Sequence, residues 1–456
     1  MLFIYTSSSL TSPDSSENFS FFAVQSVCSN LESSNCKYTK TREYYVNRNI
    51  RDSRCVGGYS KVNSCDSWEM VLADSFSTGR MGSNIYKFNG AVIGSNFLTG
   101  IQKLMAIKSL ISALFLLITA LVLPKKLQRA FIFTLLFALT IPENIMHVGS
   151  IAPIGHSKIF YFMTLVLVYS VFEAELKKVE ELLSWFLIIF YSVYLGLQRT
   201  DQVVSFAFIA SGLSIIHLLR IKFQSSQLNL NNSQRNYLRP FLVFGSVVIS
   251  LLTTLLQSES KKTMTTLTDS VTDSVTDFLW QVLAQPFYLF LDLAPTFMPV
   301  SSPKVNMVRV AIISIIVPTV LYYCHRCVPK IRLISNLLPI FCAYVLFVSY
   351  GAAIGPRVEI RYIMALLLFG FFVIVTEFQE DNTVLEKRVL LGLISSTVLL
   401  YSVVFLPHIL KSERVFLFGT IFNSKIAAAI WSISLFSTFL NSYNFLTKSS
   451  GTILKS

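Results

Sequence analysis

The chain has 456 residues, of which 53% are hydrophobic and only 14% are charged. Soluble domains usually carry about 25% charged residues, so this composition excludes an ordinary soluble protein and predicts that most of the chain lies in lipid. The formal net charge of +13 does not indicate a nucleic-acid partner, because Lys and Arg stand in small groups beside apolar runs instead of gathering on one segment. Such an arrangement is typical of membrane topology.

The first segment, 1–106, is polar, rich in Ser and Asn, and contains Cys28, Cys36, Cys55 and Cys65. We predict that it is a loop domain outside the cytoplasm, with these cysteines in two disulfides that allow three pairings. The alternative is that they are free thiols in a cytoplasmic tail. Their spacings lack the short paired-ligand pattern of a structural zinc site, so we expect no metal there.

Apolar runs follow along the rest of the chain, and each predicts a helix that crosses the membrane. The eleven runs are 109–123, 131–141, 159–172, 183–197, 203–219, 241–256, 310–324, 333–350, 362–376, 389–406 and 426–440. The predicted fold is therefore an all-α integral membrane protein with about eleven transmembrane helices. The second run is so short that its helix must continue through Pro142 or stop partway across the bilayer.

Lys and Arg are distributed unevenly between alternating loops, and the richer set of loops is predicted to lie in the cytoplasm. Sixteen stand in one set: Lys125, Lys126, Arg129, Lys177, Lys178, Arg220, Lys222, Arg235, Arg239, Arg326, Lys330, Arg332, Lys387, Arg388, Lys448 and Lys455. Nine stand in the other: Lys158, Arg199, Lys261, Lys262, Lys304, Arg357, Arg361, Lys411 and Arg414. The cysteine-containing segment and the loop 351–361 then face outward.

The resulting organisation has five parts in chain order. An extracytoplasmic loop domain, 1–106, is followed by transmembrane helices over 107–256. An extracytoplasmic loop with an interfacial element, 257–307, separates these from a second set of transmembrane helices, 308–440. The chain ends in a cytoplasmic tail, 441–456.

Three short motifs stand in segments that are predicted to face outward. They are Pro13-Asp14-Ser15-Ser16-Glu17-Asn18-Phe19, Ser150-Ile151-Ala152-Pro153-Ile154, and the stretch from Gly355 to Tyr362, which ends in Arg361-Tyr362. With the predicted spans, the chain resembles over nearly its whole length the bacterial membrane proteins filed as domain-of-unknown-function family 2142. Those proteins in turn resemble C-type glycosyltransferases. The chain departs from the family pattern at Ser15, Asn18 and Ile154, where the family has glutamate, histidine and aspartate.

The resemblance implies an enzyme of the bacterial plasma membrane that transfers sugar from a polyprenyl-phosphate-linked donor in cell-envelope glycan assembly. A carboxylate of the first outer loop would act as base or position a metal, which makes Asp14 and Glu17 the catalytic candidates. Outer basic groups would hold the lipid phosphate, so Arg361 is a substrate-binding candidate, with Tyr362 and His156 beside it.

In the resembled family a spanning helix precedes the Pro-Asp motif. We therefore expect residues 1–5 to be the tail of a helix whose remainder is encoded upstream. The fold would then lack a first helix in the sequence as given.

Two other functions remain open from the sequence. One is a transporter or flippase of lipid-linked or small polar substrates, which should show repeated halves and charged or broken helices near the membrane midplane. No internal repeat is visible in the sequence, and the polar residues gather in the outer loops. The other is a non-catalytic membrane subunit. The partners implied are membrane lipid and a polyprenyl-phosphate sugar, with no nucleic acid and no identified cofactor.

Overall fold

The computed structural model describes residues 1–10, 26, 28, 36–38, 44–47, 70–73, 83–94, 97–141, 148–149, 153–198, 200–224, 230–256, 303–326, 330–354, 360–377, 383–411, 414–418 and 420–453. Within these ranges the helices are α1 Leu2–Leu10, α4 Ser83–Ile93, α5 Phe97–Val122, α6 Lys125–Leu139, α8 Pro153–Glu173, α9 Lys178–Gln198, α10 Thr200–Gln224, α11 Leu230–Leu256, α13 Pro303–Arg326, α14 Lys330–Ile354, α15 Ile360–Thr376, α16 Thr383–Lys411 and α17 Ser424–Ile453. The strands are β1 Cys36–Tyr38, β2 Tyr44–Asn47 and β3 Met70–Ala73, which form one antiparallel sheet, and β4 Arg414–Leu417 and β5 Thr420–Asn423, which form a hairpin.

Eight helices of the described part, α5, α8, α9, α10, α11, α13, α16 and α17, are long and apolar enough to cross a membrane. Shorter apolar stretches, Ile331–Leu346 and Ile363–Thr376, lie in α14 and α15. Nine of the eleven apolar runs in the sequence fall within one helix each, and the other two, 109–123 and 131–141, extend one or two residues past the ends of α5 and α6. The prediction of a helical, multi-pass membrane protein is therefore confirmed. Hydrocarbon offers no hydrogen-bond partner to the backbone. Helices suit this environment because they satisfy their backbone hydrogen bonds internally.

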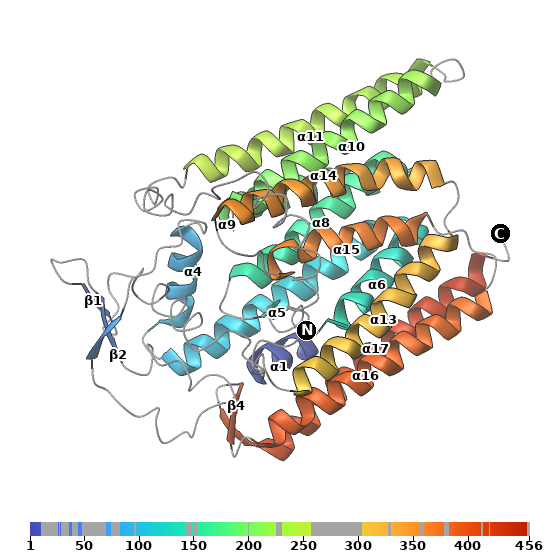
Figure 1. Ribbon diagram of the computed structural model, residues 1–456. Helices are drawn as coiled ribbons and strands as arrows, with labels where there is room; N and C mark the ends of the chain where they lie inside the picture. Colours follow the sequence, from blue (N-terminus) through green and yellow to red (C-terminus); the bar gives the residue numbers. More distant parts are fainter. Residues whose placement is uncertain are drawn as a thin grey trace.

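The helices lie side by side in one bundle around α8 (Figure 1). This central helix packs against α5, α9, α10 and α15. In its membrane-crossing window 94% of the residues are buried, against 28% for α11 at the edge of the bundle. The helices α9, α10 and α11 pack together on one flank, and α17 packs against α1, α6 and α16 on the other. The hydrophobic core of the bundle is therefore centred on α8.

The two ends of the bundle differ in composition. At one end, which we call the basic end, α8 and α10 finish and α14 begins, and it carries residues such as Lys177, Arg220 and Arg332. At the other end, which we call the hairpin end, α8 and α15 begin and the β4–β5 hairpin connects α16 to α17 (Figure 1).

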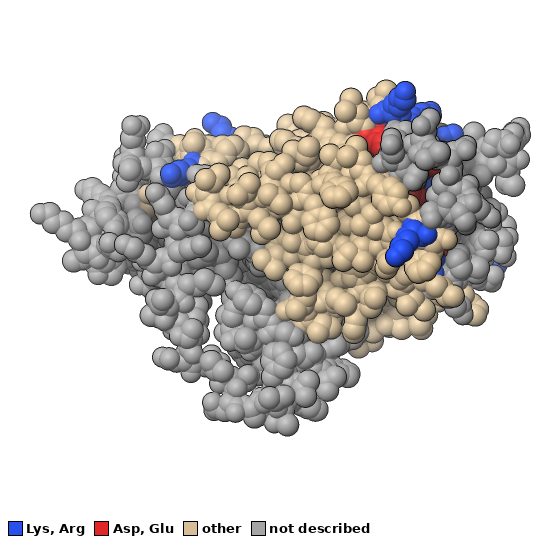
Figure 2. Space-filling model, turned by 90° about the horizontal axis from the view of Figure 1, so that it is seen from above, with Lys and Arg blue, Asp and Glu red and all other residues tan. Residues whose placement is uncertain are grey.

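The lipid-facing surface has the pattern expected of a membrane protein. Figure 2 looks down on the face over α11 and its neighbours, where a broad area without charged side chains separates Lys and Arg near the two edges. Large apolar side chains such as Phe241, Leu252 and Phe208 are exposed on these helices. In a bilayer, the exposed apolar surface contacts acyl chains.

Two glycines allow helices on this flank to approach closely. A side chain at Gly196 of α9 would collide with Thr253 of α11, and one at Gly212 of α10 would collide with Pro339 of α14. The close approach lets the Thr254 hydroxyl donate a hydrogen bond to the Gly196 carbonyl (3.3 Å). Small residues serve this purpose in membrane helices because packing, and not water exclusion, holds such helices together.

The helix α6, which contains most of the second apolar run, ends before Pro142. It ends at Leu139, and the Thr140 amide bonds to the Phe137 carbonyl in a final tight turn (3.0 Å). Its 15 residues span roughly 22 Å at 1.5 Å per residue, short of a hydrocarbon core of about 30 Å. The helix therefore stops partway across, and its buried residues pack against α15 and α17.

Several boundaries differ from those in the sequence-based organisation. The helix α5 begins at Phe97, inside the expected loop domain, and α17 continues to Ile453, through most of the expected tail. Helices extend past the hydrocarbon core into polar sequence, so apolar runs underestimate their length. Most of the segment 1–106 and residues 257–302 lie outside the described residues, and the upstream helix expected before α1 stays a prediction.

Cys28 is disulfide-bonded, and its partner is not among the described side chains. This agrees with the expectation that Cys28, Cys36, Cys55 and Cys65 are oxidised. We predict that mass spectrometry of non-reduced protein finds no free thiol among the four, while Cys342, an exposed free cysteine of α14, is alkylated as an internal control. Alkylation of all four without reduction would contradict the two disulfides and the outward placement of this segment.

Candidate functional site

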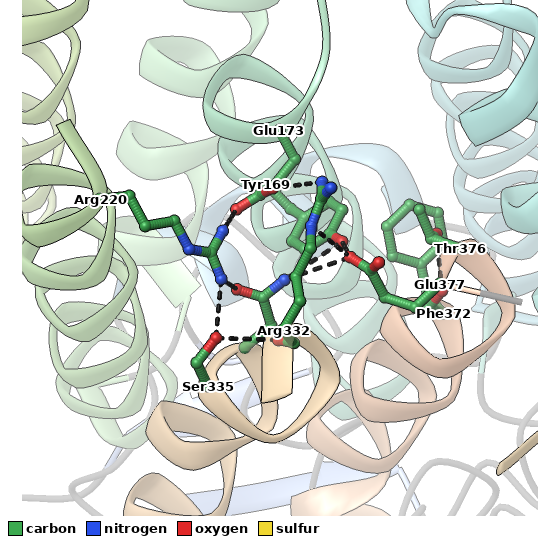
Figure 3. Close-up of polar contacts among 9 residues, drawn as sticks. Tyr169, Glu173, Arg220, Arg332, Ser335, Phe372, Thr376 and Glu377 are labelled. Carbon is green, nitrogen blue, oxygen red and sulfur yellow. Dashed lines mark hydrogen bonds and ion pairs between the residues drawn. The ribbon is translucent and has the colours of Figure 1, made fainter. Parts of the chain in front are cut away.

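The most extensive polar cluster joins four helices at the basic end (Figure 3). Glu173, the last residue of α8, lies between two guanidinium groups. Its Oε1 pairs with Arg220 of α10, and its Oε2 accepts a hydrogen bond from Arg332 Nη2 of α14 (2.6 Å). Arg220 also donates to the Ser335 hydroxyl (2.7 Å).

A second carboxylate, Glu377, completes the cluster directly after α15. Its Oε1 lies 3.2 Å from Arg332 Nε and accepts hydrogen bonds from the Tyr169 hydroxyl (2.8 Å) and from Asn336 Nδ2 (3.3 Å). The Asn336 amide oxygen in turn accepts from Arg220 Nη2 (2.8 Å). Only 4% of the Glu377 side chain is exposed, so its charge is stabilised by these partners instead of by water.

This cluster is suited to holding helices together. Two carboxylates face two guanidinium groups, so the charges balance, and the polar atoms of Asn336 and Tyr169 are occupied. A pair between Arg239 of α11 and Glu181 of α9 (3.2 Å) adds a further link at the same end. Both carboxylates of the cluster are already engaged with cations, so neither is available as a general base.

His156, a predicted substrate-binding residue, lies in the first turns of α8 and is buried. Its Nε2 lies 3.2 Å from the Lys108 carbonyl oxygen, which can only accept, so Nε2 carries the proton. Nδ1 therefore accepts a hydrogen bond from the Tyr194 hydroxyl of α9. Both ring nitrogens are used within the bundle, and the imidazole is neutral in this arrangement.

An apolar cavity of about 400 Å³ lies on another side of α8. Residues of α1, α5, α6, α8, α15 and α17 line it. Lys158 of α8 is the charged residue among the described lining residues. The cavity reaches the first turns of α8 at Gly155 and of α15 at Met364.

The structure places the other predicted site residues as follows. Arg361 and Tyr362 lie in the first turn of α15, at the hairpin end, and the directions of their side chains are not described. Asp14 and Glu17 lie outside the described residues. The structure therefore brings His156, Arg361 and Tyr362 to one end of the bundle and leaves the two carboxylates as predictions.

Sequence reasoning missed two buried lysines. Lys108 is 2% exposed and Lys158 is 6% exposed, although both belong to helices of the bundle. Each stands directly before an apolar run, at 109–123 and 159–172, and Lys158 was counted with the loop charges. A lysine that directly precedes an apolar run can belong to the same helix as the run, and this pattern could have indicated both residues. An ionisable residue inside a membrane helix marks a functional candidate.

Comparison of the chain with known protein families, curated proteins and solved structures found no match. Among the described residues, no group of three His, Cys, Asp or Glu side chains could hold a metal ion.

We predict that Glu173→Gln destabilises the protein, because it removes the charge that pairs with Arg220 and Arg332. The free energy of unfolding should fall by about 1–3 kcal/mol, below the roughly 3–5 kcal/mol of a fully buried pair, since 43% of the Arg332 side chain is exposed. Glu175→Gln, an exposed carboxylate two residues later, is the matched control. Thermal unfolding of the purified variants measures the difference, and equal melting temperatures would show that the cluster does not stabilise the bundle.

Proposed function

We propose that the chain is a glycosyltransferase of the bacterial plasma membrane that takes sugar from a polyprenyl-phosphate-linked donor for envelope glycan assembly. One observation supports this most directly. The helices α8 and α15 pack against each other and run in the same direction, so the first turns that carry His156 and Arg361-Tyr362 lie at one end.

Ring contacts show how the two helices align. The Tyr169 ring of α8 packs against the rings of Phe372 (5.7 Å) and Phe369 (6.2 Å) of α15. His156 precedes Tyr169 by roughly 20 Å along α8, and Arg361 precedes Phe369 and Phe372 by roughly 12–17 Å along α15, at 1.5 Å per residue. The candidate residues of the two helices therefore lie at similar depth, near the hairpin end.

The proposed reaction divides its chemistry between the candidate residues. The bond between the sugar anomeric carbon and the donor phosphate breaks, and a bond to the acceptor hydroxyl oxygen forms. The Asp14 carboxylate, with Glu17 nearby in sequence, takes the acceptor proton. Arg361 stabilises the negative charge that remains on the lipid phosphate, since a guanidinium binds phosphate oxygens in two parallel hydrogen bonds.

The reaction requires that the hairpin end face outward. The uneven distribution of Lys and Arg supports this orientation. We predict that cysteines introduced into the segment 257–307 of a cysteine-free variant react with a membrane-impermeant reagent in intact cells, whereas cysteines in the loop 225–229 react only after permeabilisation. The reverse pattern would overturn the orientation.

We predict that Asp14→Asn abolishes the reaction, because it keeps the shape of the side chain and removes its basicity. Loss of a general base lowers a rate by about 10²–10⁴-fold. The measurement is whether the variant restores the envelope glycan that deletion of the gene removes, at unchanged protein level. Asp52→Asn, in the same segment, is the matched control and should restore it fully.

The phosphate contact has its own comparison. Arg361→Gln should also fail to restore the glycan. Arg309→Gln removes a guanidinium from the first half of α13 and should restore it. Restoration by both Asp14→Asn and Arg361→Gln would contradict the transferase.

Transport of lipid-linked or small polar substrates is the second candidate, and one observation favours it. Lys108 is buried about halfway along α5, beside His156 of α8. Ionisable residues inside a bundle are a feature of transport pathways. Full restoration by the Asp14 and Arg361 variants, together with loss in Lys108→Met, would identify the transporter.

A further inference from the structure

The helix α5 presents one apolar face to the membrane. In its membrane-crossing window only 39% of the residues are buried, so much of this helix contacts lipid. Four leucines, which we call the leucine row, follow one another at spacings of three and four residues and therefore share one face of the helix. They are Leu110, Leu114, Leu117 and Leu121, and each is exposed. The row spans roughly 16 Å at 1.5 Å per residue, close to one leaflet's half of a hydrocarbon core of about 30 Å.

Two lysines stand at the basic end of the leucine row. Lys125 and Lys126 begin α6, four and five residues after Leu121, and both are exposed. Neither forms an ion pair in the part of the chain that the structure describes. No Asp or Glu occurs in the sequence from residue 75 to residue 142. The positive charge of this pair is therefore not offset by its own surroundings in the chain.

Trp185 of α9 indicates the depth of these lysines in the membrane. The helices α5 and α9 run in opposite directions, and the Thr119 hydroxyl lies 3.0 Å from the Tyr191 hydroxyl. Lys125 follows Thr119 by six residues and Trp185 precedes Tyr191 by six, so both lie roughly 9 Å beyond this contact towards the basic end. Tryptophan is enriched at the level of lipid headgroups. The lysine pair therefore lies where a lipid phosphate can reach it.

A second pair of exposed lysines at the same end has different surroundings. Lys177 and Lys178 lie between α8 and α9, with the exposed carboxylate Glu175 two residues before them. Glu180 Oε2 also accepts a hydrogen bond from the Lys177 backbone amide (3.0 Å). Carboxylates so close in the chain offset the charge of this pair and reduce its attraction for an anion. The two pairs therefore differ in their net local charge.

We propose that the leucine row and the pair Lys125 and Lys126 bind one anionic phospholipid from the leaflet at the basic end. The lipid phosphate lies between the two ammonium groups, and one acyl chain lies along the row. The leucines alone do not distinguish lipids, because apolar contact is non-directional and every acyl chain makes it. The lysines favour a headgroup of net negative charge. The inference goes beyond the proposed function, because this site lies at the opposite end of the bundle from the candidate transferase residues.

The test uses the full chain in phosphatidylcholine nanodiscs with a trace of phosphatidylglycerol that carries a photoactivatable group in its acyl chain. Phosphatidylcholine with the same group is the control probe, since its headgroup has no net charge. After illumination, mass spectrometry of the peptides should find phosphatidylglycerol on α5 between residues 110 and 121. We expect a preference of roughly 5–25-fold over the control, from about 5-fold for each lysine near a membrane surface. Added salt should reduce this preference, because the lysines are exposed.

Variants distinguish this site from a general effect of charge at the basic end. The double variant Lys125→Gln and Lys126→Gln should abolish the preference, and replacement of both lysines by Arg should keep it. The matched control, Lys177→Gln with Lys178→Gln, removes the same charge from the same end and should also keep it. Equal labelling of α5 by the two probes in the native protein would overturn the proposal. Equal loss of the preference in the two Gln double variants would overturn it as well.

Discussion

The structure depends on one constraint, that hydrocarbon offers no hydrogen-bond partner to a polar group. Hydroxyl groups meet it locally: Ser109, Thr134 and Thr164 each donate to the carbonyl four residues earlier in their own helix. Ionised groups cannot do so and need partners from other helices. This explains why the most buried helix, α8, ends in a carboxylate that two arginines share, and why that cluster joins four helices at the basic end.

The sequence predicts the helices well because apolar length is a local property that one stretch of chain carries by itself. It predicts their ends less well, since α5 contains Gln102 and Lys108 and α17 extends through a polar stretch to Ile453. It cannot predict the ion cluster, because partners such as Glu173 and Arg332 are 159 residues apart. Their meeting depends on how the helices pack, for which hydropathy carries no signal.

In the candidate site, too, the sequence does not predict which neighbours a side chain of α8 meets, even within one helical turn. Sequence reasoning selected His156, and the structure places its ring towards α5 and α9, with both nitrogens occupied. Lys158, two residues later, lies roughly 200° around the helix at 3.6 residues per turn and lines the cavity instead. The sequence does not indicate which face of α8 lines the cavity, because the face is set by the neighbours of the helix.

Residues of the short helix α6 form part of the wall of the apolar cavity. Interiors of proteins are close-packed, and an empty space costs about 24 cal/mol per Å³ in a soluble core. By that measure the cavity of about 400 Å³, left empty, would cost on the order of 10 kcal/mol, as much as the whole net stability of a typical domain. A cavity of this size is therefore unfavourable to leave empty.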